Sequence, residues 1–498
     1  MGERLPVIYV RGFGGGQSGI DRAVDDPFYG LNEGSTHIRV GDRGTPRFYQ
    51  FEGPLVRLLL EQGYRPLVGG GQEALLLDSA DESLEPTSVW VYRFYDKNAA
   101  TFGAEPAPYR IEESAEGLAA YIELVLRKTK GADRVNLVAH SMGGLICRSA
   151  LQRYLVHPER TVSKLVTIGT PHGGIDPTLG GSIGDWVMDR FGPNGADIFQ
   201  PRRMKEYLLP EGDDGAGSTD PRTGDWDPRR LVGDFPVSRV LSIVGTNAHD
   251  YEVAHGLSRT AMGPQSDGLV AVRNAYVRGS ARAYVHRSHS GRYGLVNSEE
   301  VYQNLRRFLF GSLRVELGFR DLDLDRTSGR VWQAEARLAV RGIPVLMHEQ
   351  TAANFCPIDL AAEEEKRPTP TAPMPLVTTF LHTSDRAFMR YALQLKVISL
   401  EQRGGVFGFF DHLEQTADWE DTLVVDVKTN DEGLAEEVRW QWNSALAGRI
   451  AERPLLEHRL EWEPGRADNW KPSIPLPDLG RQVLGAQAAL ELAVSRWE

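Results

Sequence analysis

The stretch Val135–Gly144, V-N-L-V-A-H-S-M-G-G, decides the fold. Its first half, Val135–Ala139, is a short apolar run rich in β-branched residues, which predicts a buried strand rather than a helix. The run that follows, Leu145–Leu151, is typical of a helix. A strand that turns directly into a helix around a serine is the setting of a nucleophile elbow, in which Ser141 takes a strained backbone conformation.

The residues two places before and two places after the serine support this interpretation. Strand and helix nearly touch at such an elbow, so small residues are needed there, and Ala139 and Gly143 occupy these positions. The usual pattern has glycine at both places, and alanine departs from it in identity but not greatly in size. The alternative is an ordinary glycine-rich turn between a strand and a helix.

Composition and charge limit the partners of the protein. The chain has 498 residues and a net charge of −12, with 41% hydrophobic and 25% charged residues. This length predicts two domains, and the negative charge argues against nucleic acid as a partner. It leaves open a neutral or apolar ligand and peripheral contact with a membrane. No apolar run approaches the roughly 20 residues that span a bilayer, and we see no signal peptide. Two cysteines far apart, Cys147 and Cys356, fit a reducing compartment, so we expect a cytoplasmic location.

Strands and helices alternate along residues 1–311. This alternation predicts an α/β domain with a mostly parallel sheet covered by helices. Expected strands are Val7–Val10, Ser88–Tyr95, Lys164–Ile168, Arg239–Val244 and Arg282–Val285, and expected helices are Pro54–Gln62, Ile111–Lys128 and Ser298–Leu309, the last capped by Ser298.

The alternation breaks over about residues 175–236. Within this insertion, Ile183–Phe191 has apolar residues on one helical face. Such a helix is expected either to form a lid over an apolar pocket or to pack on the sheet.

A glycine-rich loop, Arg11–Gly16, follows the first strand. No Lys-Ser/Thr pair follows it and no helix is expected to open there, which excludes a phosphate-binding loop. We predict an oxyanion loop, in which the N–H of Phe13 and the N–H of Met142 stabilise a carbonyl oxygen as it becomes negative. A plain turn is the alternative.

Chain order restricts the acid and the base that could serve Ser141, since in this arrangement the acid follows the serine and the histidine follows the acid. The predicted acid is Asp267, in a tight Ser-Asp-Gly turn, with Asp250 as the alternative. The predicted base is His289, in a loop before the final helix of the domain, with His286 as the alternative.

Three motifs resemble the α/β-hydrolase superfamily, specifically its lipase-like serine esterases: Ala139–Gly144, Gly169–Gly174 and Ser266–Val270. Bacterial triacylglycerol lipases and the GPI inositol-deacylase-like branch are similar at these points. The resemblance covers about residues 5–311. It implies Ser141 as nucleophile, Asp267 as acid and His289 as base, with the oxyanion held by the N–H groups of Phe13 and Met142. Ser290-Gly291-Arg292 follows the base, so the calcium site of some secreted members is not expected here.

Further residues are predicted to contact the substrate: Gly14, His140, His172 and Trp186. For His172, a role in satisfying the backbone is the alternative. Together, the predicted nucleophile, base, acid and oxyanion donors indicate a serine hydrolase that cleaves carboxylic esters through an acyl-enzyme. The expected substrates are lipids or other apolar acyl esters, and no cofactor or metal is expected. An acyltransferase with the same triad, or a binding or tethering protein, remain open alternatives.

The sequence of residues 312–498 predicts a separate, mainly β domain. Here β-rich runs separated by Gly, Pro and Asp turns replace the alternation of strands and helices seen in residues 1–311. Seven of the ten tryptophans lie in this region. They indicate either an aromatic binding surface or the filling of a β core, and the sequence assigns the domain no role.

Overall fold

The chain folds as two compact units in the computed structural model. One consists of Arg4–Arg282 and His286–Tyr302, and the other mainly of Gln303–Glu498 with Ala283–Val285. The structure describes residues 4–13, 17–25, 29, 38–40, 46–48, 52–67, 72–100, 109–175, 196–220, 223–249, 265–290, 294–324, 330–365, 372–382, 388–401, 417–430, 435–445, 456, 458–460, 469–470 and 473–497.

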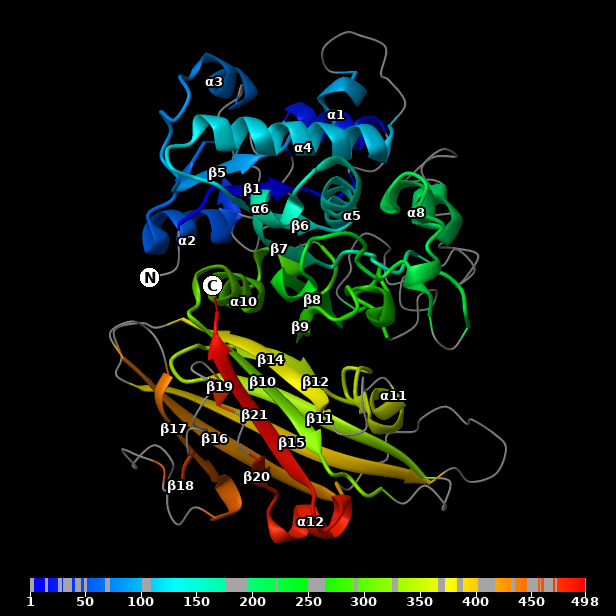
Figure 1. The fold of residues 1–498 in the computed structure, drawn as a ribbon, viewed down its shortest axis with the longest axis vertical. Coiled ribbons are helices and arrows are strands. Elements are labelled where there is room, and N and C mark those ends of the chain that lie inside the picture. The colour runs from blue at the N-terminus through cyan, green and yellow to red at the C-terminus, as the bar shows by residue number, and fades with distance from the viewer. Residues whose placement is uncertain are drawn as a thin grey trace. The chain divides into compact units, whose positions relative to one another are not determined.

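A seven-stranded sheet in the order β4-β5-β1-β6-β7-β8-β9 organises the α/β part of the chain (Figure 1). Its strands are β1 Val7–Val10, β4 Arg65–Pro66, β5 Ser88–Val91, β6 Val135–His140, β7 Val162–Ile168, β8 Val240–Gly245 and β9 Ala281–Val285. All the pairings from β4 through β8 are parallel. Residues of β1, β6 and β7 are buried throughout, as expected for a parallel sheet covered on both faces.

Helices cover this sheet (Figure 1). They are α1 Gln17–Asp25, α2 Glu52–Gln62, α3 Gln72–Asp78, α4 Ile111–Lys128, α5 Met142–Ser149, α6 Pro158–Thr161, α8 Pro201–Leu208 and α10 Glu299–Phe310. The apolar face of α4, which includes Leu118, Ile122 and Val125, is fully buried. Helix α5 packs on α4 and on β1, β6 and β7, so the residues just before it lie at the carboxyl ends of the central strands.

Most predicted elements of this unit are confirmed, including the cap of α10, where the Val301 N–H donates to Ser298 Oγ at 3.2 Å. Two predictions were wrong. Helix α1 begins directly after the glycine-rich loop, where no helix was expected. Strand β5 ends at Val91 rather than Tyr95, because its neighbour β1 ends at Val10 and the last pair between the two strands is Tyr9 with Val91.

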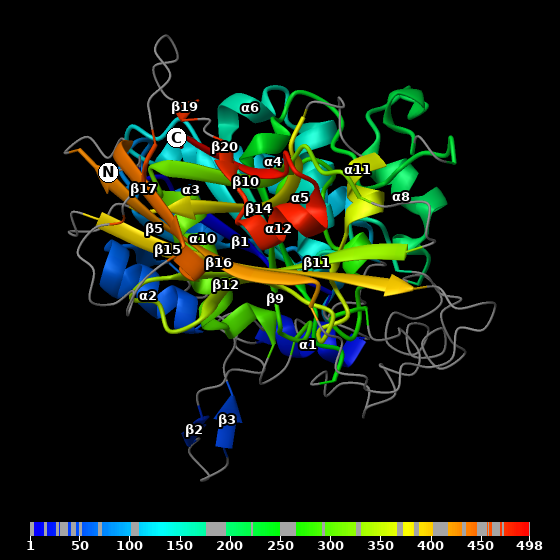
Figure 2. The same cartoon turned by 90° about the horizontal axis from the view of Figure 1, so that it is seen from below.

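The insertion predicted over about 175–236 contains α8, which is tied to α4 by an ion pair. The two Arg203 Nη atoms lie 2.5 and 2.8 Å from the carboxylate oxygens of Glu112. The predicted lid helix Ile183–Phe191 lies outside the described residues. Strands β2 Ile38–Val40 and β3 Pro46–Phe48 form a separate antiparallel ribbon (Figure 2).

The second unit is a β-sandwich. One sheet has the order β14-β10-β21-β19, with β20 on β21, and the other has the order β12-β11-β15-β16-β17-β18, with β13 on β11. The bounds are β10 Leu313–Arg320, β11 Arg330–Val340, β12 Leu346–Gln350, β13 Ile358–Asp359, β14 Met374–Leu381, β15 Phe388–Glu401, β16 Trp419–Thr429, β17 Ala435–Trp442, β18 His458–Arg459, β19 Asn469–Trp470, β20 Ser473–Pro475 and β21 Ala489–Arg496, with helices α11 Leu360–Glu365 and α12 Asp478–Leu484.

Alternate residues of facing strands form one core between the two sheets, for example Val315 and Leu317 of β10 with Leu393 and Leu395 of β15. Trp332, Trp419 and Trp442 belong to this core. These tryptophans therefore fill the sandwich, which is the second of the two interpretations left open by the sequence.

Candidate active site

Ser141 lies at the sharp turn between the end of β6 and the start of α5. Its backbone has φ 53° and ψ −128°, a conformation that non-glycine residues rarely adopt. The surrounding backbone holds it there, since the Ser141 N–H donates to the Ile168 carbonyl at 2.9 Å and the Gly144 N–H donates to the Ser141 carbonyl at 3.1 Å. Such strain at a buried turn is typical of a functional residue.

The small residues around the serine are required by the closeness of β1. A Cβ atom on Gly143 would lie 2.3 Å from the Val10 carbonyl oxygen, and one on Gly12 would lie 2.7 Å from Ser141 Cβ. Neither position can therefore accept a larger residue without movement of the backbone. Ala139 is fully buried and pairs with Val10, so a methyl group is accommodated where glycine is usual.

The predicted nucleophile, base and acid form one hydrogen-bonded chain. Ser141 Oγ lies 3.0 Å from His289 Nε2, and His289 Nδ1 lies 2.9 Å from Asp267 Oδ2. A carboxylate only accepts, so Nδ1 carries the proton and Nε2 is left to accept from the serine hydroxyl. The exposed fractions are 7% for Ser141, 3% for His289 and 0% for Asp267, so the chain is shielded from bulk water.

The turn around Asp267 fixes the direction of its carboxylate. Oδ1 accepts hydrogen bonds from the N–H groups of Leu269 and Val270, at 3.0 and 2.7 Å, which leaves Oδ2 for the histidine. The His289 N–H also donates to the Asp267 carbonyl at 2.8 Å. Both backbone and side chain of the acid therefore orient the base.

The structure brings His289, and not His286, to the serine. His286 is exposed, and its Nδ1 lies 3.2 Å from Thr246 Oγ1. The alternative acid, Asp250, lies outside the described residues.

Gly169, at the end of β7, provides space for the pair formed by Asp267 and His289. A Cβ atom on Gly169 would lie 3.2 Å from His289 Nδ1 and 3.3 Å from Asp267 Oδ2, and its φ of +56° disfavours a side chain independently. Gly245, at the end of β8, is similarly restricted, since its Cβ would lie 2.7 Å from Asp267 Cβ. Glycines at these strand ends were not recognised from the sequence, although Gly169 opens one of the motifs of the resemblance.

The two predicted oxyanion donors flank the serine. Met142 is the first residue of α5, so its N–H has no acceptor within the helix. Phe13 follows Gly12, which lies against Ser141, and its ring contacts those of Tyr95 and Tyr109, with centroids 6.4 and 6.5 Å away. Gly14, predicted to contact the substrate, lies outside the described residues, as does Trp186.

His140 and His172, also predicted to contact the substrate, are held by protein groups. His140 Nε2 lies 3.1 Å from the His289 carbonyl oxygen, and burial, assisted by the neighbouring His289, lowers the pKa of His140 to about 3. His172 is fully buried, with Nε2 3.0 Å from Thr167 Oγ1 and Nδ1 3.4 Å from Arg148 Nη1. Burial lowers the pKa of His172 well below its usual range, and the Arg148 cation adds to the effect.

Arg148, on α5, was not singled out from the sequence. It is fully buried, and it donates to the carbonyls of Pro228 and Arg230 at 2.8 and 2.7 Å. Burial lowers its pKa to about 10. Through these bonds the helix that follows the serine holds the end of the insertion. The sequence signal available was an arginine in a helix otherwise expected to be buried.

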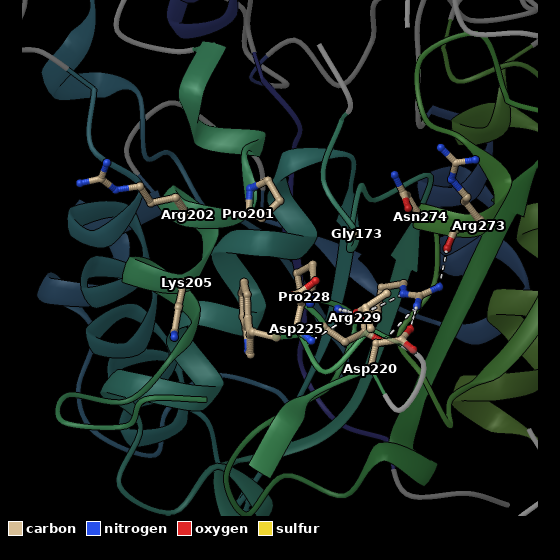
Figure 3. A pocket seen from close by; sticks show the side chains of 13 residues that line it. Gly173, Pro201, Arg202, Lys205, Asp220, Asp225, Pro228, Arg229, Arg273 and Asn274 are labelled. Carbon is tan, nitrogen blue, oxygen red and sulfur yellow. Dashed lines mark hydrogen bonds and ion pairs between the residues drawn. The ribbon is translucent and has the colours of Figure 1, made fainter. Parts of the chain in front are cut away.

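A cavity of about 590 Å³ is lined mainly by residues of the insertion (Figure 3). It is lined by Gly173, Pro201, Arg202, Lys205, Asp220, Thr223, Asp225, Trp226, Asp227, Pro228, Arg229, Arg273 and Asn274, and therefore not by Ser141, Asp267 or His289. Arg229 is paired with Asp227 at 2.9 Å and with Asp220 at 3.5 Å. The side chains of Arg202, Lys205 and Arg273 extend in different directions, so they do not converge on one point (Figure 3).

Two negative findings hold for the part of the chain that the structure describes. No three His, Cys, Asp or Glu side chains are grouped as metal ligands would be. No helix there has the length and apolar character that crossing a membrane requires.

A parallel sheet covered by helices, with a strained serine hydrogen-bonded through histidine to aspartate, defines the α/β-hydrolase class. Residues 11–189 match the family model described as alpha/beta hydrolase fold. The fold of this part of the chain is therefore that of the α/β hydrolases, and the chain is similar to lipases of that class.

Its relatives include triacylglycerol lipase 2 of Saccharomyces cerevisiae, 36% identical over 103 residues, which are 20% of this chain and 28% of the yeast protein. The triacylglycerol lipase of Pseudarthrobacter phenanthrenivorans is 39% identical over 97 residues, 20% of this chain and 26% of that protein. The triacylglycerol lipase of Burkholderia plantarii is 39% identical over 97 residues, 20% of this chain and 23% of that protein. The match thus spans about a quarter of the length of these relatives.

Two solved structures are similar over most of the chain at low identity. A Bacillus licheniformis lipase in its propeptide form has a TM-score of 0.34 and 11% identity, covering 87% of this chain and 95% of that one. A Legionella pneumophila phospholipase in complex with thio-NAD has a TM-score of 0.33 and 13% identity, covering 83% of this chain and 91% of that one.

Proposed function

We propose that the protein hydrolyses carboxylic esters, and that its substrates are lipids or other apolar acyl esters. The observation that carries the proposal is the hydrogen-bonded chain Ser141–His289–Asp267, with distances of 3.0 and 2.9 Å. Strain at Ser141 is further support, because strained backbone conformations cluster at functional sites.

The geometry leads to a two-stage reaction. Ser141 Oγ attacks the ester carbonyl while His289 Nε2 accepts the hydroxyl proton, and the N–H groups of Phe13 and Met142 hold the oxyanion. The C–O bond to the alcohol then breaks, and His289 returns its proton to the leaving oxygen. Water attacks the resulting acyl-serine while His289 accepts its proton. The bond between the acyl carbon and Ser141 Oγ then breaks, His289 returns the proton to Oγ, and the carboxylic acid is released. Asp267 stays ionised and stabilises the imidazolium.

The preference for apolar acyl groups has weaker but specific support. Phe13, Tyr95 and Tyr109 place aromatic rings next to the predicted oxyanion donor. The relatives that match the chain are triacylglycerol lipases by name. An apolar wall beside the carbonyl site would favour an acyl chain over a charged group.

The test is hydrolysis of p-nitrophenyl esters from acetate to palmitate by the wild type and by Ser141→Ala. Loss of the nucleophile is expected to lower kcat by up to about a millionfold. Ser149→Ala is the matched control, because Ser149 lies on the same helix and its hydroxyl donates to the Tyr207 carbonyl at 2.6 Å, so activity should remain. Equal rates for wild type and Ser141→Ala would refute the enzyme, and a flat profile over chain length would refute only the apolar preference.

A further inference from the structure

His140 makes a contact that the reaction described above does not use. It is the last residue of β6, immediately before the nucleophile, and only 9% of its surface is exposed. Its Nε2 lies 3.1 Å from the backbone carbonyl oxygen of His289, and the two imidazole rings are 5.0 Å apart between centroids. The residue before the serine is thus bonded to the main chain of the base.

This bond fixes which nitrogen of His140 carries a proton. A carbonyl oxygen only accepts, so Nε2 must be the donor. The other nitrogen, Nδ1, faces the oxyanion loop, since a Cβ atom on Gly12 would lie 3.3 Å from it. A ring buried in this way stays neutral, so it does not place a second positive charge beside His289 when that residue takes the serine proton.

The backbone of His289 is held from both sides. Its N–H donates to the Asp267 carbonyl at 2.8 Å, and its carbonyl accepts from His140. The side chain is held by Asp267 and Ser141. Without His140, the carbonyl would lose its imidazole donor, and the loop of the base would lose a direct side-chain link to β6.

We propose that His140 is a positioning residue: its Nε2–H fixes the main chain of His289 and so keeps the base at the correct distance from Ser141. This inference rests on the proposed ester hydrolysis. It differs from the direct substrate contact predicted for His140 from the sequence, which stays a prediction. A displacement of the base by about 1 Å is enough to lower turnover about a hundredfold.

The experiment compares wild type, His140→Gln and His140→Leu with a short and a long p-nitrophenyl ester. The Gln amide N–H can replace Nε2–H, whereas Leu fills space without donating. We expect Leu to lower kcat about 10- to 100-fold with KM within about twofold on both esters, and Gln to restore kcat to within about threefold of wild type. Equal loss in both variants would overturn the proposal, as would a change in KM that grows with acyl chain length at unchanged kcat.

A readout independent of turnover separates this inference from the proposed function. The proton on His289 Nδ1, bonded to Asp267, is observed by NMR as a downfield imidazole signal. This signal should be present in wild type and in His140→Gln, and it should be shifted or lost in His140→Leu. If wild type shows the signal but neither hydrolyses esters nor reacts with a fluorophosphonate, the proposed function fails. If all three proteins show the same signal, the positioning role of His140 fails.

Discussion

Two buried aspartates, one in each unit, show what separates a structural pair from a proposed catalytic one. In the sandwich, Asp426 lies directly across from Arg390 in the register of β15 and β16, and Arg390 Nε and Nη2 bond its two oxygens at 2.6 Å each. In the α/β unit, Asp267 gives one oxygen to backbone N–H groups and the other to a histidine. Both carboxylate oxygens of Asp426 are bonded to Arg390. Asp267 instead bonds a histidine that is itself hydrogen-bonded to Ser141.

The difference follows from the two types of sheet. Antiparallel neighbours place side chains face to face, so a buried charge finds its partner across the strands. In a parallel sheet the loops at the carboxyl ends of several strands meet, so residues distant in sequence converge there. The candidate site is therefore made of the loops after β6, β8 and β9. In the sandwich, the buried ion pair instead helps to fix the register of β15 and β16.

The sharpest test of this comparison is the same substitution in both units. Asp267→Asn should lower kcat by about four orders of magnitude with little loss of stability, because the amide supports the wrong tautomer of His289. Asp426→Asn should leave kcat near wild type but lower the free energy of unfolding by about 3 kcal/mol, because Arg390 loses its buried counterion. Ester kinetics and urea unfolding of both variants measure this. A large loss of kcat in Asp426→Asn would contradict the distinction between the structural role of Asp426 and the proposed catalytic role of Asp267.

Gly169 tests how tightly the reactive pair is packed. Gly169→Ala should lower kcat about 10- to 100-fold, since the new methyl group presses on His289 and Asp267. The matched control is Gly131→Ala, whose φ of +63° is equally unfavourable but which has open space around the new Cβ. Gly131→Ala should lose about 1–2 kcal/mol of stability through its backbone conformation alone, and Gly169→Ala should lose at least as much. Equal kcat in the two variants would show that contact with the pair has no effect.

The last expected effect is on the acid stability of the α/β unit, and it leaves turnover at neutral pH out of account. The pKa of His140 falls from 6.5 to about 3 on folding, through burial and the neighbouring His289. The unfolded chain thus binds a proton on this ring at pH values where the folded chain does not, so stability is lost as the pH falls from about 6.5 to about 3. His172 acts in the same direction.

His140→Gln removes the part of this loss that His140 causes. The difference between the free energies of unfolding at pH 7 and pH 4.5 should therefore be smaller in the variant than in wild type. Urea unfolding at the two pH values measures it. An unchanged difference would mean that His140 is protonated in the folded protein or contributes nothing to its acid sensitivity.

The fold and the central residues could be predicted because their signals are local. In the sequence, the serine lies directly between the apolar run of β6 and the glycines that follow. Chain order then reduced the number of residues that could be the acid and the base. Arg148 and the role of His140 could not be predicted, because they depend on which carbonyl lies opposite each side chain. The helix after the glycine-rich loop was missed because Gln17–Asp25 has only nine residues and is mostly polar, so no apolar run marks it in the sequence.

The separation of the reactive residues along the chain has a consequence for refolding. The elbow connects adjacent elements, but Ser141 and His289 are 148 residues apart, and His289 follows the last strand of the sheet. Contacts between residues so far apart in the sequence form late in folding, because the long chain segment between them must be ordered first. During refolding, helical structure is therefore expected to return before reactivity at Ser141, so covalent labelling of the serine would report the final docking of the β9 end of the sheet.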